Sequence, residues 1–195
     1  MQTKQLLVTI CALASALCLA EDFNGGFEQC KPDKSGVPLP LDWVSNKIVS
    51  RQSQARLAGT EGEARTGRFS LLTETEEGGC LSFRSLRHVP VASGDSIEME
   101  IHAKGEGRFA LQYIAYGADD PKRLVFISTL GTGKTAEASA DEWRLHSVKV
   151  TFAIPKKAEG KHQAFAILPV IYVYGGAGIL FDDFKMSVGA QGNHP

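Results

Sequence analysis

Residues 97–102 read Ile-Glu-Met-Glu-Ile-His, so apolar and polar side chains alternate one for one. A repeat of two residues is typical of a β-strand with one buried and one solvated face, whereas a helix repeats every 3.6 residues. Residues 148–154, Val-Lys-Val-Thr-Phe-Ala-Ile, show the same alternation. Both stretches therefore predict strands of an antiparallel sheet that packs one face on a core.

Three further segments are rich in β-branched and aromatic residues, and turn residues separate them from one another. These segments are residues 108–116, 123–129 and 163–174. Residues 134–142 have a helical composition but no apolar stripe, which favours a loop. We therefore expect a single all-β domain over residues 21–188, a β-sandwich jelly roll.

The first 20 residues have the three parts of a secretory signal peptide. Lys4 supplies the positive charge, an apolar run extends from Leu6 to Ala16, and Cys18-Leu19-Ala20 offers a small-residue cleavage site. The apolar run is short for a membrane span. We therefore expect cleavage near Ala20 and a secreted, periplasmic or cell-surface protein, with a polar tail over residues 189–195.

The overall charge argues against a nucleic-acid partner. The chain has 21 Lys and Arg against 22 Asp and Glu, a formal net charge of −1, and a nucleic-acid binder normally carries a basic footprint. No segment after the signal peptide is long and apolar enough to span a bilayer. The composition leaves the oligomeric state open.

Two cysteines, Cys30 and Cys80, remain after cleavage of the signal peptide. An even number of cysteines in an exported chain is typical of a disulfide. Closing a loop of about 50 residues would stabilise the fold by about 4 kcal/mol on the chain-entropy model. The alternative is two free, buried thiols.

Two short motifs bracket the predicted domain, Asn24-Gly25-Gly26-Phe27-Glu28 at its start and residues 179–184, Ile-Leu-Phe-Asp-Asp-Phe, at its end. Between them, in order, come Pro40 to Trp43, Thr66 to Leu71 and Asp141 to Trp143. This order resembles the galactose-binding-like jelly rolls, in particular the carbohydrate-binding modules found beside xylanases and glucanases. The resemblance covers roughly residues 22 to 188.

In that family a structural calcium ion often ties the first strand to the last. Calcium takes hard oxygen ligands from carboxylates and backbone carbonyls. The resemblance implies Glu28 and Asp183 as side-chain ligands, with Asp182 as the alternate and carbonyls from residues 63–67. The alternative is that these carboxylates are solvated or paired with an arginine.

Tyr172 and Tyr174 are the main candidates for contact with a sugar. They lie two apart, so they share one face of a strand while Ile171 and Val173 point to the other. An aromatic ring suits the C–H face of a pyranose. Four residues on or near neighbouring predicted strands would complete a polar and aromatic platform: Gln112, Tyr113, Tyr116 and Arg123. The sequence leaves open whether Trp43 packs in the core or contributes to the binding site. For the tyrosines, the alternative is that they only pack against neighbours or lie on a solvated sheet without binding a ligand.

The sequence therefore predicts a secreted, non-catalytic protein that binds a polysaccharide or other glycan. One alternative is a cell-surface or periplasmic structural protein that keeps the jelly roll without a sugar site. The other is a small polysaccharide lyase or hydrolase, for which a lyase would draw on His102, Gln112, Tyr113 and Arg144. The spacing of residues in the sequence does not reveal a nucleophile with a neighbouring base, and no pair of carboxylates follows a pattern that indicates a glycosidase.

Overall fold

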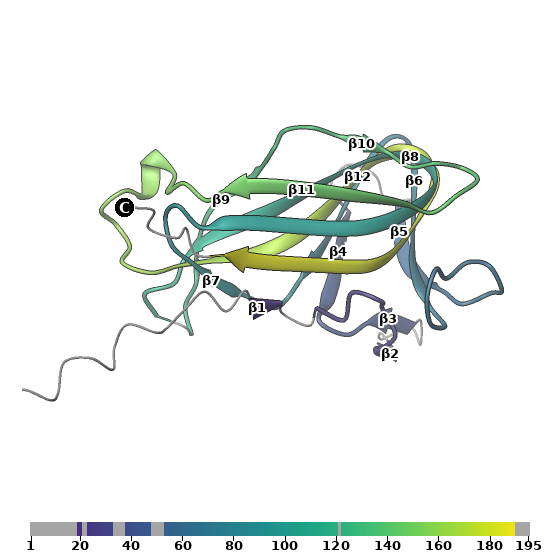
Figure 1. Ribbon diagram of the computed structural model, residues 1–195, viewed down its shortest axis with the longest axis horizontal. Helices are drawn as coiled ribbons and strands as arrows, with labels where there is room; N and C mark the ends of the chain where they lie inside the picture. Colours follow the sequence, from purple (N-terminus) through teal and green to yellow (C-terminus); the bar gives the residue numbers. More distant parts are fainter. Residues whose placement is uncertain (1–18, 21–22, 33–37, 48–52, 121, 190–195) are drawn as a thin grey trace, which may run out of the picture.

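A computed structural model of the chain describes residues 19–20, 23–32, 38–47, 53–120 and 122–189. Within these ranges there is no α-helix, and a short 3₁₀ turn spans Lys156–Ala158. The strands are β1 Leu19–Ala20, β2 Cys30–Pro32, β3 Pro38–Pro40, β4 Trp43–Lys47, β5 Gln54–Ala58, β6 Ser70–Ser85, β7 Val89–Val91, β8 Ser96–Gly117, β9 Val125–Gly131, β10 Ala136–Glu137, β11 Arg144–Thr151 and β12 Phe165–Gly189 (Figure 1). Most of the predicted signal peptide and tail, residues 1–18 and 190–195, lies outside the described residues.

Three long strands, β6, β8 and β12, run through the whole domain and curve together at one end (Figure 1). β12 lies between β8 and β6 and pairs antiparallel with each of them. Because each long strand changes direction part way along, one hydrogen-bonded sheet folds over into two layers. The result is a β-sandwich jelly roll, as the alternating segments predict.

The pairing registers define the two layers. Layer 1 contains β11, residues 96–104 of β8, residues 179–189 of β12, residues 70–75 of β6, and β5. Layer 2 contains β9, residues 108–117 of β8, residues 165–174 of β12, residues 80–85 of β6, and β4. Each long strand therefore contributes one half to each layer.

The bends between the layers depend on glycine. In β8, Gly105 and Gly107 have φ values of 123° and 136°, a region that glycine enters at little cost. A Cβ on Gly105 would lie 2.2 Å from the carbonyl oxygen of Gly178 in β12. The register of β12 shifts between Tyr174 and Gly178, so the bends of the two central strands lie against each other.

The core lies between the layers. The predicted inward residues of the alternating stretch, Ile97, Met99 and Ile101, are fully buried. Phe109 of layer 2 contacts Phe181 of layer 1, with ring centroids 5.0 Å apart, which shows that the two layers face each other. No helix among the described residues is long and apolar enough to cross a bilayer.

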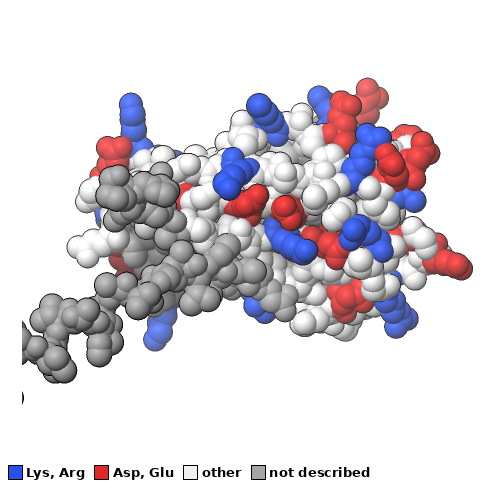
Figure 2. Space-filling model, in the orientation of Figure 1, with Lys and Arg blue, Asp and Glu red and all other residues white. Residues whose placement is uncertain are grey.

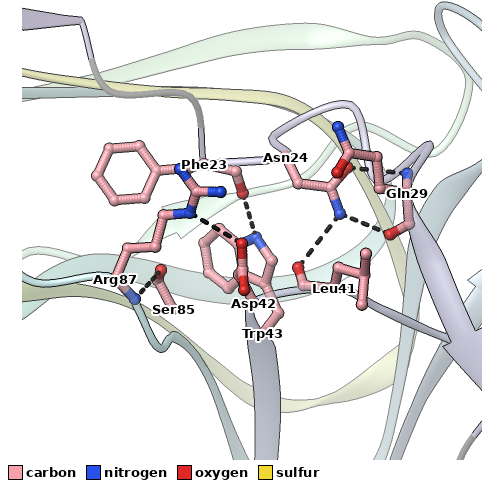
Figure 3. Close-up of polar contacts among 8 residues, drawn as sticks. All are labelled: Phe23, Asn24, Gln29, Leu41, Asp42, Trp43, Ser85 and Arg87. Carbon is pink, nitrogen blue, oxygen red and sulfur yellow. Dashed lines mark hydrogen bonds and ion pairs between the residues drawn. The ribbon is translucent and has the colours of Figure 1, made fainter.

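The N-terminal motif is fastened to the start of β4 by side-chain hydrogen bonds (Figure 3). The Asn24 side chain accepts from the backbone N–H of Gln29 (3.0 Å) and donates to the carbonyls of Gln29 (2.7 Å) and Leu41 (3.2 Å). The Trp43 indole N–H donates to the Phe23 carbonyl at 2.7 Å. The motif therefore closes one end of the core.

Candidate functional site

One outer surface of the sandwich combines aromatic, polar and cationic side chains. Directly opposite residues of an antiparallel pair project to the same face. Tyr174 lies opposite Cys80 of β6 and Arg108 of β8, and Tyr172 lies opposite Ser82 and Ala110. We call this outer surface of layer 2 the tyrosine face: Cys80, Ser82, Arg84, Arg108, Ala110, Gln112, Ile114, Tyr116, Leu168, Val170, Tyr172 and Tyr174.

The two tyrosines form a stacked pair on this face. Their ring centroids are 6.4 Å apart and their planes differ by 18°, and both side chains are half-buried. Ile171 and Val173 point into the core, with exposed fractions of 0% and 2%, so the alternation predicted from the sequence is confirmed. The aromatic pair therefore belongs to the solvent side of the sheet.

A hollow of about 750 Å³ adjoins this pair. Its lining includes Tyr174, Arg108 and residues 75–80 of β6. Burial raises the pKa of the Tyr174 hydroxyl, and the neighbouring Cys80 and Tyr172 raise it further. The phenol therefore stays protonated at neutral pH and is available as a hydrogen-bond donor at the edge of the hollow.

The other end of the tyrosine face is built around Tyr116. Its ring packs edge-on against Phe126 (6.1 Å) and His88 (5.8 Å), and its hydroxyl accepts from Arg84 Nη1 at 3.4 Å. Burial lowers the pKa of His88, and the Arg84 charge lowers it further. Between the two ends, Ile114, Leu168 and Val170 are buried as a small apolar floor.

The outer surface of layer 1 is different in character. Lys149 of β11 pairs with Glu98 of β8 at 3.7 Å, and Lys185 of β12 lies opposite Glu100. Figure 2 shows basic and acidic side chains intermixed over the strands that lie toward the viewer. Only layer 2 therefore offers an aromatic outer surface among the described strands.

Two of the predicted platform residues are in the core. Tyr113 is 4% exposed and packs beside Phe152, with centroids 6.3 Å apart. Trp43 is 3% exposed and stacks on Phe83 at 5.1 Å. Both rings face the sandwich interior, so the platform position predicted for Tyr113 is wrong, and of the two alternatives left open for Trp43 the core is the one observed. Gln112 and Tyr116 do lie on the tyrosine face.

The remaining polar candidates are scattered. Arg123 lies exposed in the turn before β9, where its N–H donates to the Asp120 carbonyl at 2.9 Å. The residues suggested for a lyase do not meet: His102 lies opposite Asp182 in layer 1, whereas Gln112 is on the outside of layer 2. Arg144 is exposed and paired with Glu142. The described residues therefore bring no such catalytic group together.

The predicted disulfide is absent. Cys30 is an exposed free thiol in the β2–β3 hairpin, and Cys80 is a half-buried free thiol beside Tyr174. The two positions belong to different sheets. Burial raises the pKa of the Cys80 thiol, so it is protonated and weakly nucleophilic at neutral pH.

The two bracketing motifs meet, as predicted, around a loop over residues 60–69. Asp182 is fully buried, and its carboxylate accepts from the backbone N–H groups of Arg65 (2.8 Å), Thr66 (3.0 Å) and Asp183 (2.7 Å). Burial raises the pKa of Asp182 against the lowering effect of these hydrogen bonds. Glu28 Oε1 accepts from the backbone N–H groups of Arg68 (2.8 Å) and Phe69 (2.9 Å).

These carboxylates do not fit a calcium ion as they are placed. Asp183 binds the Arg65 guanidinium at 2.5 Å and the Thr66 hydroxyl at 2.7 Å, so a positively charged side chain already pairs with the carboxylate that calcium would need as a ligand. Among the described residues, no group of three or more His, Cys, Asp or Glu side chains is arranged to hold a metal. The structure thus shows the alternative named from the sequence, a carboxylate paired with an arginine, here Asp183 with Arg65. The calcium ion itself stays a prediction.

Three residues of importance were missed from the sequence: Arg84, Arg108 and Arg65. The first two join the tyrosine face only through the pairing of β6 and β8 with β12, and no local pattern indicates which strands pair. Arg65 lies 117 residues before Asp182 in the chain. It belongs to the turn whose backbone carbonyls were expected to bind calcium, and its side chain was not considered.

The strand order and the two packed layers define the class of fold, a β-sandwich jelly roll. No protein-family model matches the chain, and no curated protein matches its sequence. Comparisons with solved structures do give matches at low sequence identity, which establish likeness of fold alone.

The chain is similar in fold to an arabinose-bound MgGH51 α-L-arabinofuranosidase, with a TM-score of 0.52, 11% identity and 85% of this chain covered. It is also similar to the enzymatically active domain of tailspike protein 4 from bacteriophage CBA120, with a TM-score of 0.51, 10% identity and 76% covered. The chain spans only 26% and 19% of these two chains. A further match is the CBM22-1 xylan-binding domain of Paenibacillus barcinonensis Xyn10C, with a TM-score of 0.46, 14% identity, and 86% of this chain and 93% of that chain covered.

Proposed function

We propose that this protein is a non-catalytic glycan-binding module that holds its ligand on the tyrosine face. The observation that carries the proposal is the stacked pair of Tyr172 and Tyr174 beside an open hollow. Concave sites with aromatic lining and a few convergent polar groups are the usual form of a ligand site.

The chemistry of this surface suits a sugar. The rings offer flat apolar faces to the C–H face of a pyranose, and the phenolic hydroxyls donate to its oxygens. Ser82 and Gln112 flank the pair on neighbouring strands, and both side chains accept as well as donate hydrogen bonds. A rigid sheet holds all of these groups, so little conformational entropy is lost on binding.

The direct test is a glycan array followed by titration calorimetry on the mature protein and on three variants. Tyr172→Ala and Tyr174→Ala each remove one ring, and we expect each to weaken binding about tenfold or more, the size of effect seen when an aromatic anchor is truncated. Tyr174→Phe keeps the ring and should retain most of the affinity.

The matched control is Leu145→Ala. Leu145 is 54% exposed on β11, so this variant removes exposed apolar surface from the opposite layer and should bind like the wild type. Binding to no glycan would favour a structural protein. Binding that survives loss of both rings would place the site elsewhere on the molecule.

We further propose that the protein acts outside the cytoplasm after removal of residues 1–20. The support is the three-part pattern of the N-terminal sequence. Intact-mass measurement of the protein recovered from its native host tests this directly, with a mature chain beginning at Glu21 as the expected result. A chain that keeps residues 1–20 would overturn it.

A further inference from the structure

The charged residues in the five main strand segments of layer 2 are all basic, and the acidic Glu137 lies in β10, the short strand that pairs with Arg108. The five segments, β4, β9 and residues 80–85, 108–117 and 165–174, contain no aspartate or glutamate. They contain three basic residues: Lys47, Arg84 and Arg108. Layer 1, in contrast, carries both signs of charge (Figure 2).

The charge of Arg108 is balanced locally. Glu137 of β10 lies directly opposite Arg108, and Glu76 and Glu77 line the same hollow. These carboxylates reduce the positive potential near the Tyr174 end of the tyrosine face. Arg108 is therefore not the group that selects an anion.

Arg84 lacks such a balance. It lies opposite Val170 on one side and Val44 on the other, and among the described residues it has no ion pair. The acid nearest in sequence to β4, Asp42, binds Arg87 instead at 2.8 Å (Figure 3). A half-buried guanidinium is normally paired, so an unpaired one on a candidate binding surface is unusual.

The guanidinium also has an unused donor. Arg84 Nε is buried and has no hydrogen-bond partner within the described part of the chain, while Nη1 makes one long bond to the Tyr116 hydroxyl. Burial lowers the pKa of the neighbouring His88, and the Arg84 charge lowers it further. The side chain is thus held in place, and because Nε is buried, a ligand would reach the guanidinium through its Nη groups.

The position of Arg84 relates it to the tyrosine pair. Tyr172 lies opposite Ser82, two residues from Arg84 on the same face of β6. Such diagonal neighbours lie about 7–8 Å apart in an antiparallel sheet. A sugar stacked on Tyr172 therefore extends naturally toward the guanidinium.

From this geometry we infer that the ligand is an acidic glycan, with a uronic-acid carboxylate bound by Arg84 next to the Tyr172 ring. A guanidinium presents a planar fork that matches a carboxylate with two parallel hydrogen bonds. This inference rests on the proposed function, since it assigns a ligand class to the same surface.

The test uses three polymers: polygalacturonate, the same polymer with its carboxyls methyl-esterified, and a neutral galactan. Calorimetry on the mature protein is compared with Arg84→Gln and Arg84→Lys. We expect the wild type to prefer polygalacturonate, with Arg84→Gln weakening that binding about ten- to a hundredfold, as for the loss of a charge-assisted hydrogen bond. Arg84→Lys keeps the charge without the fork and should fall between.

The matched control is Arg56→Gln, which removes the same charge from β5 in layer 1 and should leave binding unchanged. A thermal melt of each variant confirms that it folds. Equal binding of all three polymers, unaffected by Arg84→Gln, would overturn the inference and leave the glycan-binding function standing. Binding of none of these polymers or of any array glycan would overturn both.

Discussion

Replacing Gly25 by alanine should break the junction between the first and last segments of the domain. A Cβ at this position would lie 1.8 Å from the carbonyl oxygen of Phe184 and 2.7 Å from its carbonyl carbon. Carbon atoms in ordinary contact lie about 3.5–4.0 Å apart. Because the obstacle is backbone rather than a flexible side chain, the two segments must move apart by about 1.5 Å to accept the methyl group.

That movement has an estimable cost. Forcing one methyl group into a packed interior costs about 1–3 kcal/mol. The hydrogen bond from Phe184 N–H to the Gly25 carbonyl, 3.0 Å long, would also be lost at about 1 kcal/mol. We expect Gly25→Ala to lower the free energy of unfolding by about 2–4 kcal/mol, which is about 4–16 °C in the melting midpoint for a domain of this size.

The neighbouring glycine gives the control. A Cβ on Gly26 would meet nothing closer than 3.9 Å, so Gly26→Ala should leave the midpoint unchanged or raise it slightly by restricting the unfolded chain. Thermal denaturation followed by circular dichroism, with urea titration as a second measure, compares the two variants. Equal midpoints for Gly25→Ala, Gly26→Ala and the wild type would refute the close approach of these segments.

Three further outcomes follow from the structure. Addition of a chelator should leave the melting midpoint unchanged, because the Arg65 guanidinium already pairs with Asp183; a fall that calcium reverses would show that the ion displaces the arginine. A reducing agent should also leave the midpoint unchanged, since Cys30 and Cys80 are both free. Alkylation of the denatured, unreduced protein should modify both cysteines, and a measured mass without the two alkyl groups would contradict this. Burial lowers the pKa of His146 below 6.5, so as the pH falls the histidine is protonated in the unfolded chain before it is protonated in the folded one. The free energy of unfolding therefore falls as the pH drops below about 6.5. Urea titrations at pH 7.5 and 5.5 should show a smaller fall in this free energy for His146→Gln than for the wild type.

The sequence predicted the fold because its local signals are strong and consistent. The alternation at Ile97, Met99 and Ile101 placed these side chains in the core, where they are fully buried. The spacing of Tyr172 and Tyr174 likewise placed both rings on one outer face. These are properties of a single strand, and a period of two is readable without knowing its neighbours.

The sequence failed where the answer depends on pairing. Tyr113 was expected on the platform, but it adjoins Gln112 and a strand can turn only one of two neighbours outward. Arg84 and Arg108 reach the tyrosine face only because β6 and β8 flank β12. The cysteine pair misled because cysteine count indicates an oxidised pair but not whether two segments approach each other.

The same central strand serves the junction and the tyrosine face, yet the two are structurally separate. Residues 165–174 of β12 form the middle of the tyrosine face, whereas Asp182 and Phe184 belong to the half that meets the N-terminal motif. A register shift between Tyr174 and Gly178, packed against Gly105, lies between these halves. Because the two halves lie in different layers, a strained junction should lower stability without altering the outward direction of the tyrosines. Gly25→Ala should therefore bind glycan as the wild type does at temperatures below its melting transition, and a loss of affinity in the folded variant would show that the two regions are coupled through β12.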